Sequence, residues 1–247
     1  MSVNPVNISI VIPVLNDAPA LAHCLESLHR ANSESVSTQI IVVDGGPSED
    51  CKRAALAAGA EYLIARRGRA SQMNAGAKLA RGEWLWFLHA DCAPHPDSLQ
   101  AILDLSTTAS WGCFKHRVDA PGLGLRVIEC ADNLRAKLLS LPYGDQGIFV
   151  RRDLFEKIGG YVDVPLLEDV MLAQALKKVS RARVLKPLLE SSARRWLQRG
   201  VLRTTLTNWK IMWLYLAMRR KPEALAAIYR GNAKADAAST AAPASRP

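Results

Sequence analysis

Short apolar runs alternate with amphipathic stretches over residues 1–90. The runs are rich in β-branched or aromatic residues, which is typical of buried strands in a parallel sheet, and the stretches between them indicate helices. The pattern predicts strands over 8–15, 39–43, 61–65 and 84–88, and helices over 18–31, 50–58 and 70–80. We therefore expect an α/β fold: a doubly wound, Rossmann-like, mostly parallel sheet with helices on both faces and right-handed crossovers.

Polar side chains follow three of the four predicted strands. Asn16 and Asp17 follow the first strand, Asp44 the second, and His89 and Asp91 the fourth. The carboxyl ends of parallel strands share one edge of a sheet, where open α/β folds bind ligands, so these residues are expected to converge on one crevice. Each of them alone has an alternative role as a turn former or a helix cap.

The residue types at this crevice narrow the kind of ligand. Asp91 suits a cation that bridges phosphates, and the alternative is that it caps a helix that begins near Pro94. No G-x-G-x-x-G motif follows the first strand, and the P-loop pattern is also missing. The remaining interpretation is nucleotide binding by acids that contact the base and ribose, with a cation for the phosphates.

A basic, amide-rich segment precedes the fourth strand. Arg69, Gln72 and Asn74 fall in the first turns of the helix predicted over 70–80, close to the expected phosphates. A guanidinium group suits a phosphate or a base edge because it donates two parallel hydrogen bonds. The alternative is a solvated basic loop.

The next part of the chain predicts a strand over 111–118, a Pro-Gly loop over 119–124 and a helix over 127–139 with Arg135 and Lys137 exposed. Gly144, Asp145 and Gln146 come before a strand over 148–151. Taken alone, this tripeptide is as readily a turn as a site, because Gly and Asp are turn formers.

Two acids, Glu168 and Asp169, open a predicted helix whose apolar face holds Leu172, Ala175 and Leu176. Acids in a first helical turn are favoured by the helix dipole alone.

A helix predicted over 198–219 carries an apolar stripe at steps of four and three residues, made of Leu202, Leu206, Trp209, Trp213 and Leu216. Residues 194–221 are rich in arginine and lysine. We favour packing of the stripe on the α/β domain or in a homodimer, and the alternative is peripheral contact with an anionic membrane. Trp196 and Arg195 are candidates for closing the ligand crevice at the strand ends. Residues 231–247, rich in Ala, Ser and Pro, indicate a disordered tail.

Composition adds limits on class and setting. The net charge of +9 resides in the C-terminal part, since residues 181–230 hold 12 basic against 2 acidic residues, whereas residues 1–180 hold 18 against 20. Five dispersed cysteines without a C-x-x-C motif suggest neither a zinc site nor a disulfide framework. We expect no signal peptide and no membrane span, and a cytoplasmic protein, with the inner membrane face as a further option.

Four motifs occur in order: Ser-Ile-Val-Ile-Pro-Val-Leu-Asn-Asp over 9–17, Val-Val-Asp-Gly-Gly-Pro-Ser-Glu-Asp over 42–50, Gly-Arg-Ala-Ser-Gln-Met-Asn-Ala-Gly-Ala over 68–77, and Phe-Leu-His-Ala-Asp over 87–91. Together they resemble family 2 glycosyltransferases with the GT-A fold, and in particular a bacterial subgroup with His-Ala-Asp and Gly-Asp-Gln motifs. The resemblance covers about residues 8–180. It implies a hexosyl- or related transferase that moves a sugar from a nucleotide-diphosphate sugar, with inversion and with Mg²⁺ or Mn²⁺.

The resemblance also implies roles for individual residues. Asp169 is the expected general base, supported by Glu168, and Asp91 with His89 is the expected metal site. The expected donor-nucleotide residues are Pro13, Asn16, Asp17, Asp44, Arg69, Gln72, Asn74 and Ala90, and the expected sugar or acceptor residues are Gly144, Asp145, Gln146 and Trp196. His89 replaces the first acid of the usual Asp-x-Asp motif, and because imidazole suits Mn²⁺ better than Mg²⁺, the metal's identity stays open.

The sequence therefore predicts a GT-A catalytic domain over 1–190, with a nucleotide-sugar half over 1–92 and an acceptor half over 93–190, then a basic helical segment over 191–230. The acceptor is a small molecule or a lipid-linked molecule. The alternatives are a nucleotidyltransferase or a non-catalytic nucleotide- or nucleic-acid-binding protein. Nucleic acid is not expected as a partner, because the acids of the crevice would repel phosphates in the absence of a metal.

Overall fold

The computed structural model describes residues 6–31, 36–105 and 109–229. The chain divides into two compact units, Met1–Asp163 with Glu168–Ser192, and Val164–Leu167 with Ala193–Pro247. Each unit is described by itself. The predicted tail over 231–247 lies outside the described residues, and the predicted functional division at residue 190 stays a prediction.

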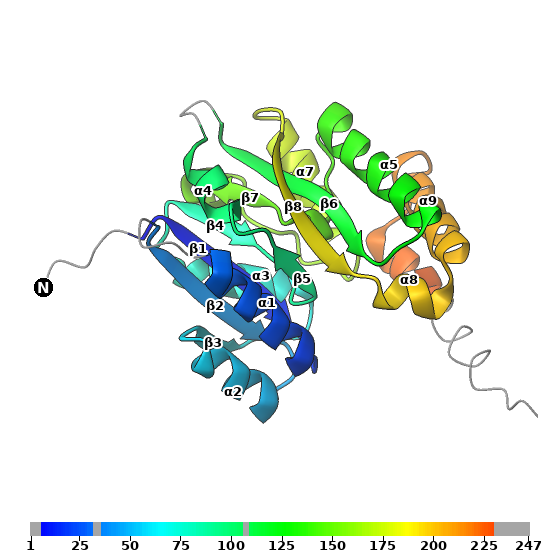
Figure 1. The fold of residues 1–247 in the computed structure, drawn as a ribbon. Helices are drawn as coiled ribbons and strands as arrows, with labels where there is room; N and C mark the ends of the chain where they lie inside the picture. The colour runs from blue at the N-terminus through cyan, green and yellow to red at the C-terminus, as the bar shows by residue number, and fades with distance from the viewer. Residues whose placement is uncertain (1–5, 32–35, 106–108, 230–247) are drawn as a thin grey trace, which may run out of the picture. The chain divides into compact units, whose positions relative to one another are not determined.

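An eight-stranded mixed sheet forms the first unit, in the order β3-β2-β1-β4-β7-β6-β8-β5 (Figure 1). Strands β3, β2, β1 and β4 are parallel, β7 is antiparallel to both of its neighbours, β6 and β8 are parallel, and β5 is antiparallel to β8. The strands are β1 (Ile8–Val14), β2 (Thr38–Asp44), β3 (Glu61–Ile64), β4 (Trp84–Phe87), β5 (Cys92–Pro94), β6 (Trp111–Asp119), β7 (Phe149–Arg151) and β8 (Arg183–Ser192).

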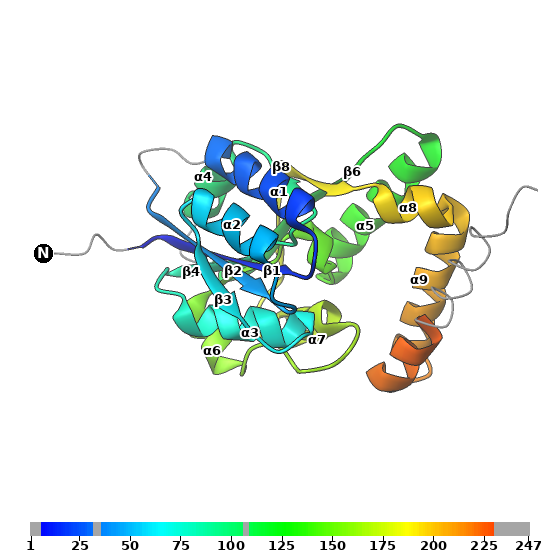
Figure 2. The same ribbon diagram turned by 90° about the horizontal axis from the view of Figure 1, so that it is seen from below.

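Helices cover both faces of this sheet (Figure 2). Helices α1 (Ala18–Ala31), α2 (Glu49–Ala57) and α4 (Ser98–Leu103) lie on one face, and α3 (Arg69–Leu79), α6 (Arg152–Lys157) and α7 (Glu168–Lys177) lie on the other. Helix α5 (Leu123–Leu139) contacts β6 and β8, and the short 3-10 helix η1 (Gly144–Gln146) precedes β7. Two apolar cores result, one around Leu21 and Leu28 of α1 and one around Met73 of α3.

Most predicted elements are confirmed within one residue at each end, including all seven in the first 90 residues. Three predictions for the first unit are wrong. Cys92–Pro94 forms strand β5, paired with β8, and α4 begins only at Ser98, so Asp91 does not cap the next helix. Helix α5 begins four residues early, directly after Gly122 with its φ of 135°. Arg135, predicted to be exposed, is largely buried and hydrogen-bonded.

The second unit contains α8 (Arg194–Arg199) and α9 (Val201–Leu216). The sequence predicted one helix over 198–219, but Gly200, at a φ of 80°, separates the two helices. Thr204 and Ile211 are the buried residues of α9, whereas the predicted apolar stripe lies on its opposite, exposed face. Within the described ranges, every helix is too short or too polar to cross a bilayer.

Candidate active site

The ends of β1 and β2 form the first part of the site. Pro13 is buried within β1, and the exposed Asn16 turns the chain in the left-handed region, at a φ of 51°. Asp17 then accepts a hydrogen bond from the Ala20 amide at 3.4 Å, at the start of α1. The structure thus gives Asp17 a capping contact and leaves Asn16 at the surface of the sheet edge where ligands bind in such folds.

Asp44, at the end of β2, is fully buried, and both of its carboxylate oxygens are hydrogen-bonded. One oxygen accepts the Gly46 amide at 2.9 Å and the other accepts the Tyr62 hydroxyl at 2.8 Å. Burial and the hydrogen bond to Asp44 raise the pKa of Tyr62 to about 12, so this hydroxyl stays a donor. The Gly45-Gly46 turn is therefore held by the same acid that was predicted to contact a base.

Gln72 is buried in α3 and donates to two strand ends, the Val14 carbonyl at 2.8 Å and the Val43 carbonyl at 2.7 Å. A Cβ atom at Gly45 would lie 2.8 Å from the Gln72 amide oxygen, so the glycine permits this close approach. The side chain is engaged with the backbone on every side. The role of Gln72 in donor binding stays a prediction. Because its side chain bonds the backbone, we expect it to act by holding the ends of β1 and β2 in place.

Asn74 forms a reciprocal pair of hydrogen bonds with the backbone of Tyr161, at 2.8 and 2.9 Å. The pair joins α3 to the segment that leads to α7, although the two residues are 87 positions apart. Like Gln72, Asn74 is engaged with the chain itself.

The second part of the site brings together the loop after β4, η1 and the start of α7. The Gly144 amide donates to Asp169 Oδ2 at 2.6 Å, and the Val170 amide donates to Asp169 Oδ1 at 2.7 Å. A Cβ atom at Gly144 would lie 2.6 Å from the His89 ring, so only glycine allows this packing without displacement of the ring. His89 and Asp169, 80 positions apart in the sequence, thus meet at Gly144.

Arg69 and Glu168 form an ion pair beside this cluster, with Arg69 Nη1 3.4 Å from Glu168 Oε1. Glu168 is buried, and burial raises its pKa above the ordinary value, with the charge of Asp169 adding to the shift and that of Arg69 opposing it. Leu167, which precedes this pair, has a φ of 66°, an uncommon conformation for a bulky residue.

His89 is held neutral by its surroundings. Burial and the charge of Arg69 lower its pKa, against the opposing influence of Asp91, Asp145 and Asp169. A neutral imidazole is the form that can bind a metal ion. Ala90 is buried between His89 and the half-buried Asp91.

Among the described residues, no set of three or more His, Cys, Asp or Glu side chains is arranged to hold a metal ion. His89 and Asp91 by themselves are too few for a closed protein site.

Gln146 and Asp145 differ in their surroundings. Gln146 is fully buried: its Oε1 accepts from Arg135 and from the Tyr143 amide, both at 3.3 Å. Asp145 has a side chain that is 34% exposed, and it lies next to His116. Trp196 belongs to α8 of the second unit, and its predicted role stays a prediction.

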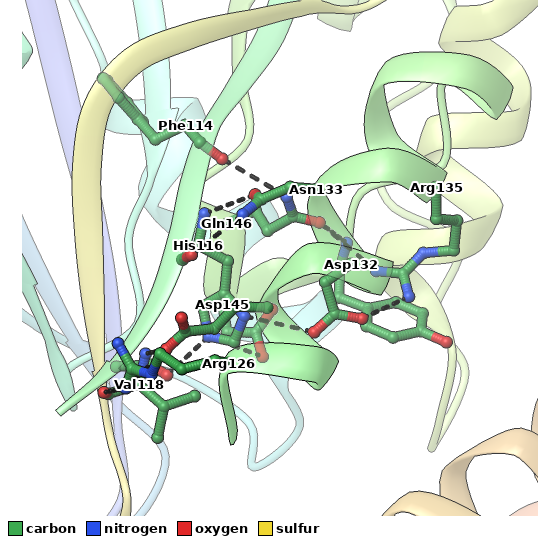
Figure 3. A network of polar contacts seen from close by, with 12 residues as sticks. Phe114, His116, Val118, Arg126, Asp132, Asn133, Arg135, Asp145 and Gln146 are labelled. Carbon is green, nitrogen blue, oxygen red and sulfur yellow. Dashed lines mark hydrogen bonds and ion pairs between the residues drawn. The ribbon is translucent and has the colours of Figure 1, made fainter. Parts of the chain in front are cut away.

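The sequence analysis missed His116 and Asp132, which support η1 from β6 and α5 (Figure 3). A signal for His116 exists in the strand pattern, because it alternates with the exposed Lys115 and Arg117 and so must point inward. Asp132 and Arg135 have the spacing of an intrahelical ion pair, three residues apart.

The sequence profile described as Glycosyl transferase family 2 matches residues 9–159, more than half of the chain. The chain therefore belongs to this family of glycosyltransferases. It is 32% identical over 167 residues to the PGL/p-HBAD biosynthesis glycosyltransferase of Mycobacterium tuberculosis, a match that covers 62% of each chain. It is also 29% identical over 145 residues to the succinoglycan biosynthesis protein ExoO of Rhizobium meliloti, covering 55% of this chain and 41% of ExoO.

The fold is shared with solved structures. The mannosyltransferase PcManGT from Pyrobaculum calidifontis, in complex with GDP-Man and Mn²⁺, superposes with a TM-score of 0.62 at 18% identity over all of this chain and 79% of its own. Glucosyl-3-phosphoglycerate synthase from Mycobacterium tuberculosis, in complex with Mn²⁺, UDP and glucosyl-3-phosphoglycerate, gives a TM-score of 0.53 at 20% identity over 75% and 70% of the two chains. The predicted GT-A fold is confirmed by these structures. The chain spans about 62% of the length of its mycobacterial relatives.

Proposed function

We propose that the protein transfers a sugar from a nucleoside-diphosphate sugar to an acceptor hydroxyl. The observation that carries the proposal is that His89 and Asp169 meet at Gly144, beside the Arg69–Glu168 ion pair. This arrangement brings together a carboxylate that can act as a base, an imidazole that can bind a metal ion and a guanidinium that can bind a phosphate. Membership of the family supports this chemistry. The nucleotidyltransferase and nucleic-acid-binding alternatives find no such support in the site or among the relatives.

Asp169 is the proposed general base. It is half-buried, so it can reach a substrate, and the two backbone amides that it accepts fix the direction of its carboxylate. The base takes the proton of the acceptor hydroxyl as the oxygen attacks the anomeric carbon, and the nucleoside diphosphate leaves from the opposite side. Glu168 stays buried and holds the Arg69 guanidinium toward the site, where that group can bind a phosphate.

The residues present fit a divalent cation. Asp91 offers a half-buried carboxylate and His89 a neutral imidazole, in surroundings that also include the carboxylates of Asp145 and Asp169. When bound, such a cation would neutralise the charge of the leaving diphosphate. His89 favours Mn²⁺ over Mg²⁺ because the hard Mg²⁺ ion prefers oxygen ligands.

A thermal-shift screen tests donor binding. The purified protein is heated with UDP, GDP, CDP and dTDP sugars, each with Mn²⁺, Mg²⁺ or EDTA, and a rise in Tm for one nucleotide class that disappears with EDTA is expected. Asp91→Ala should lose this rise, whereas Asp97→Ala, a matched change at an exposed acid, should keep it. No shift with any donor, or an unchanged shift in Asp91→Ala, would refute the proposal.

We further propose that α9 brings the enzyme to an anionic membrane surface and hence to a lipid-linked acceptor. Leu202, Trp209 and Trp213 are 73%, 62% and 60% exposed, so the stripe is not covered by its own unit. The exposed Arg203 and Lys210 lie beside it at helical spacing, and residues 193–229 hold eight basic residues against one acid. Exposed tryptophans next to cations suit an interface of apolar chains and anionic headgroups.

Vesicle sedimentation tests the membrane contact. The protein should pellet with phosphatidylglycerol-containing vesicles and not with phosphatidylcholine vesicles. The double variant Trp209→Ala/Trp213→Ala should bind more than about tenfold more weakly, because burial of each large apolar side chain contributes about 1.5–3 kcal/mol. Leu123→Ala/Val127→Ala, at two exposed apolar residues of α5, is the matched control. If light scattering instead shows a dimer that the tryptophan variant abolishes, the stripe is an interface between copies.

A further inference from the structure

A buried polar network lies behind η1, built from β6, α5 and β8 (Figure 3). Its centre is His116, whose side chain is fully buried. The ring Nδ1 lies 3.2 Å from Asp132 Oδ2, and Nε2 lies 2.8 Å from Ser191 Oγ. On the same side as Ser191, Asp145 Oδ2 lies 3.8 Å from Nε2. The imidazole therefore stands between a carboxylate of α5 and the carboxylate of the Gly-Asp-Gln segment.

The network also contacts η1 through Gln146. Asp132 Oδ1 pairs with Arg135 Nη1 at 2.6 Å, and Arg135 Nη2 donates to Gln146 Oε1 at 3.3 Å. The same guanidinium lies 3.4 Å from the centre of the Tyr143 ring. One acid of α5 thus orients both the histidine beside Asp145 and the arginine beside Gln146.

The other side of η1 belongs to the active site. Its first amide, that of Gly144, holds the proposed base Asp169, and its first Cα packs on the His89 ring. A displacement of η1 toward or away from β6 would therefore move Asp169 and His89 together.

We propose that His116, oriented by Asp132, is a positioning residue for sugar transfer: it fixes the Asp145 carboxylate and with it the η1 segment that holds Asp169. Asp145 needs such a partner. Its Oδ1 is buried without a hydrogen-bond partner among the described residues, so a positive charge on the His116 ring, 3.8 Å from Oδ2, would stabilise the carboxylate in this position. The proposal rests on the function proposed above and adds a residue that acts through Asp145.

Electrostatics support a charged imidazole. Burial alone would lower the pKa of His116, but the charges of Asp145, Asp132 and Glu129 outweigh it, so the pKa is raised above its ordinary value of 6.5. Arg135 faces Asp132 from the far side, and Ser191 supplies only a hydroxyl. A histidine with a raised pKa is mainly protonated below that raised value and loses its proton as the pH rises through it. Transfer should therefore decline on the alkaline side as His116 loses its proton.

The test compares Asp132→Asn and His116→Gln with wild type and with His95→Gln, a change at an exposed histidine. The activity is release of nucleoside diphosphate from the donor found in the thermal screen, with water as the acceptor, followed from pH 5.5 to 9.5. In both variants kcat should fall by about 10- to 100-fold, because the loss of a residue that orients a functional side chain typically has an effect of this size. KM for the donor should change little, because neither residue is proposed to contact the donor. Asp132→Asn should also move the alkaline limb to lower pH, and His116→Gln should remove it.

Two results would overturn the assignment. One is a set of variant pH profiles that superimpose on the wild-type profile after scaling, which is what a purely structural role gives. The other comes from NMR titration of the histidine rings in the wild-type protein, which needs no variant to fold: a His116 ring that titrates at or below pH 6.5 contradicts a charged link to Asp145. If no donor raises the Tm of wild type, the proposed function fails, and the ring titration still decides the state of His116.

Discussion

Asp169→Asn is the sharpest test of the proposed general base. The substitution should affect both the stability of the protein and the rate of the reaction, and the size of each effect can be estimated separately. In the wild type the two carboxylate oxygens accept backbone amides at 2.6 and 2.7 Å. Asparagine has one acceptor oxygen, so its NH₂ group would face the amide of either Gly144 or Val170. Leaving one donor unsatisfied costs about 1–3 kcal/mol of stability. At about 2–4 °C per kcal/mol, the variant should melt about 2–12 °C below wild type.

The effect on the rate should be larger. Loss of a general base slows the chemical step by about 10²- to 10⁴-fold, which corresponds to about 3–5 kcal/mol of activation free energy. Donor binding should persist, because no residue of the strand ends is changed. A thermal shift with donor and metal therefore stays, while release of nucleoside diphosphate falls.

Asp153→Asn is a matched control for this variant. Asp153 accepts the amide of the next residue, Leu154, at 2.8 Å in the first turn of α6, just as Asp169 accepts that of Val170 in α7. Its change should leave the rate within about twofold, since exposed sites away from such features have small effects. If Asp169→Asn, assayed at least 15 °C below its own Tm, turns over within about tenfold of wild type, Asp169 is not the base.

Three further predictions concern the supports of the site. Tyr62→Phe removes a hydrogen bond from the buried Asp44 and should lower the free energy of unfolding by about 1–3 kcal/mol in urea titration; an unchanged midpoint would contradict the role of this bond. Glu168→Gln should be more stable than wild type at pH 7. Burial raises the pKa of Glu168 above its ordinary value of 4.5, so wild type loses stability as the pH rises from 4.5 through the raised value, and the difference between the two proteins should vanish below pH 4.5; a difference that is constant with pH in thermal denaturation would refute this. Gly144→Ala should lose the metal-dependent thermal shift, because its Cβ atom would meet the His89 ring at 2.6 Å; a retained shift would show that the ring moves without consequence.

Elements fixed by local pattern could be predicted from the sequence, and elements fixed by distant pairing could not. Strand β1, an unbroken apolar run, was predicted within one residue. Strand β5 is three residues long, contains Pro94 and exists because it pairs with β8, about 95 positions later in the chain, so no local signal marks it. Gly200 falls inside the helix predicted over 198–219, but in the structure it separates α8 from α9 at a φ of 80°.

The same distinction holds for the candidate site. The strand-end rule placed Asn16, Asp44 and Asp91 at one edge of the sheet, and the sheet order is consistent with that rule. It could not show that Asp44 is already engaged by Tyr62 or that Gln72 bonds two strand ends, since both facts depend on side-chain contacts between separate elements. The network around His116 also depends on contacts between residues far apart in the sequence. The only local signal is the alternation of buried and exposed residues in β6, which indicates that His116 points inward.

The strand order has a consequence for how the chain folds. Strand β4 pairs with β7, which follows it by more than 60 residues, and β5 can pair only once β8, near the end of the first unit, has been made. Pairings at such sequence separation are slow to form, because a long loop has to close before they contribute stability. A ribosome would therefore release most of this unit before its sheet can be completed, and the nascent chain would carry β4 with an open edge until then. Fragments ended near residue 92 are expected to aggregate instead of forming a nucleotide-binding domain.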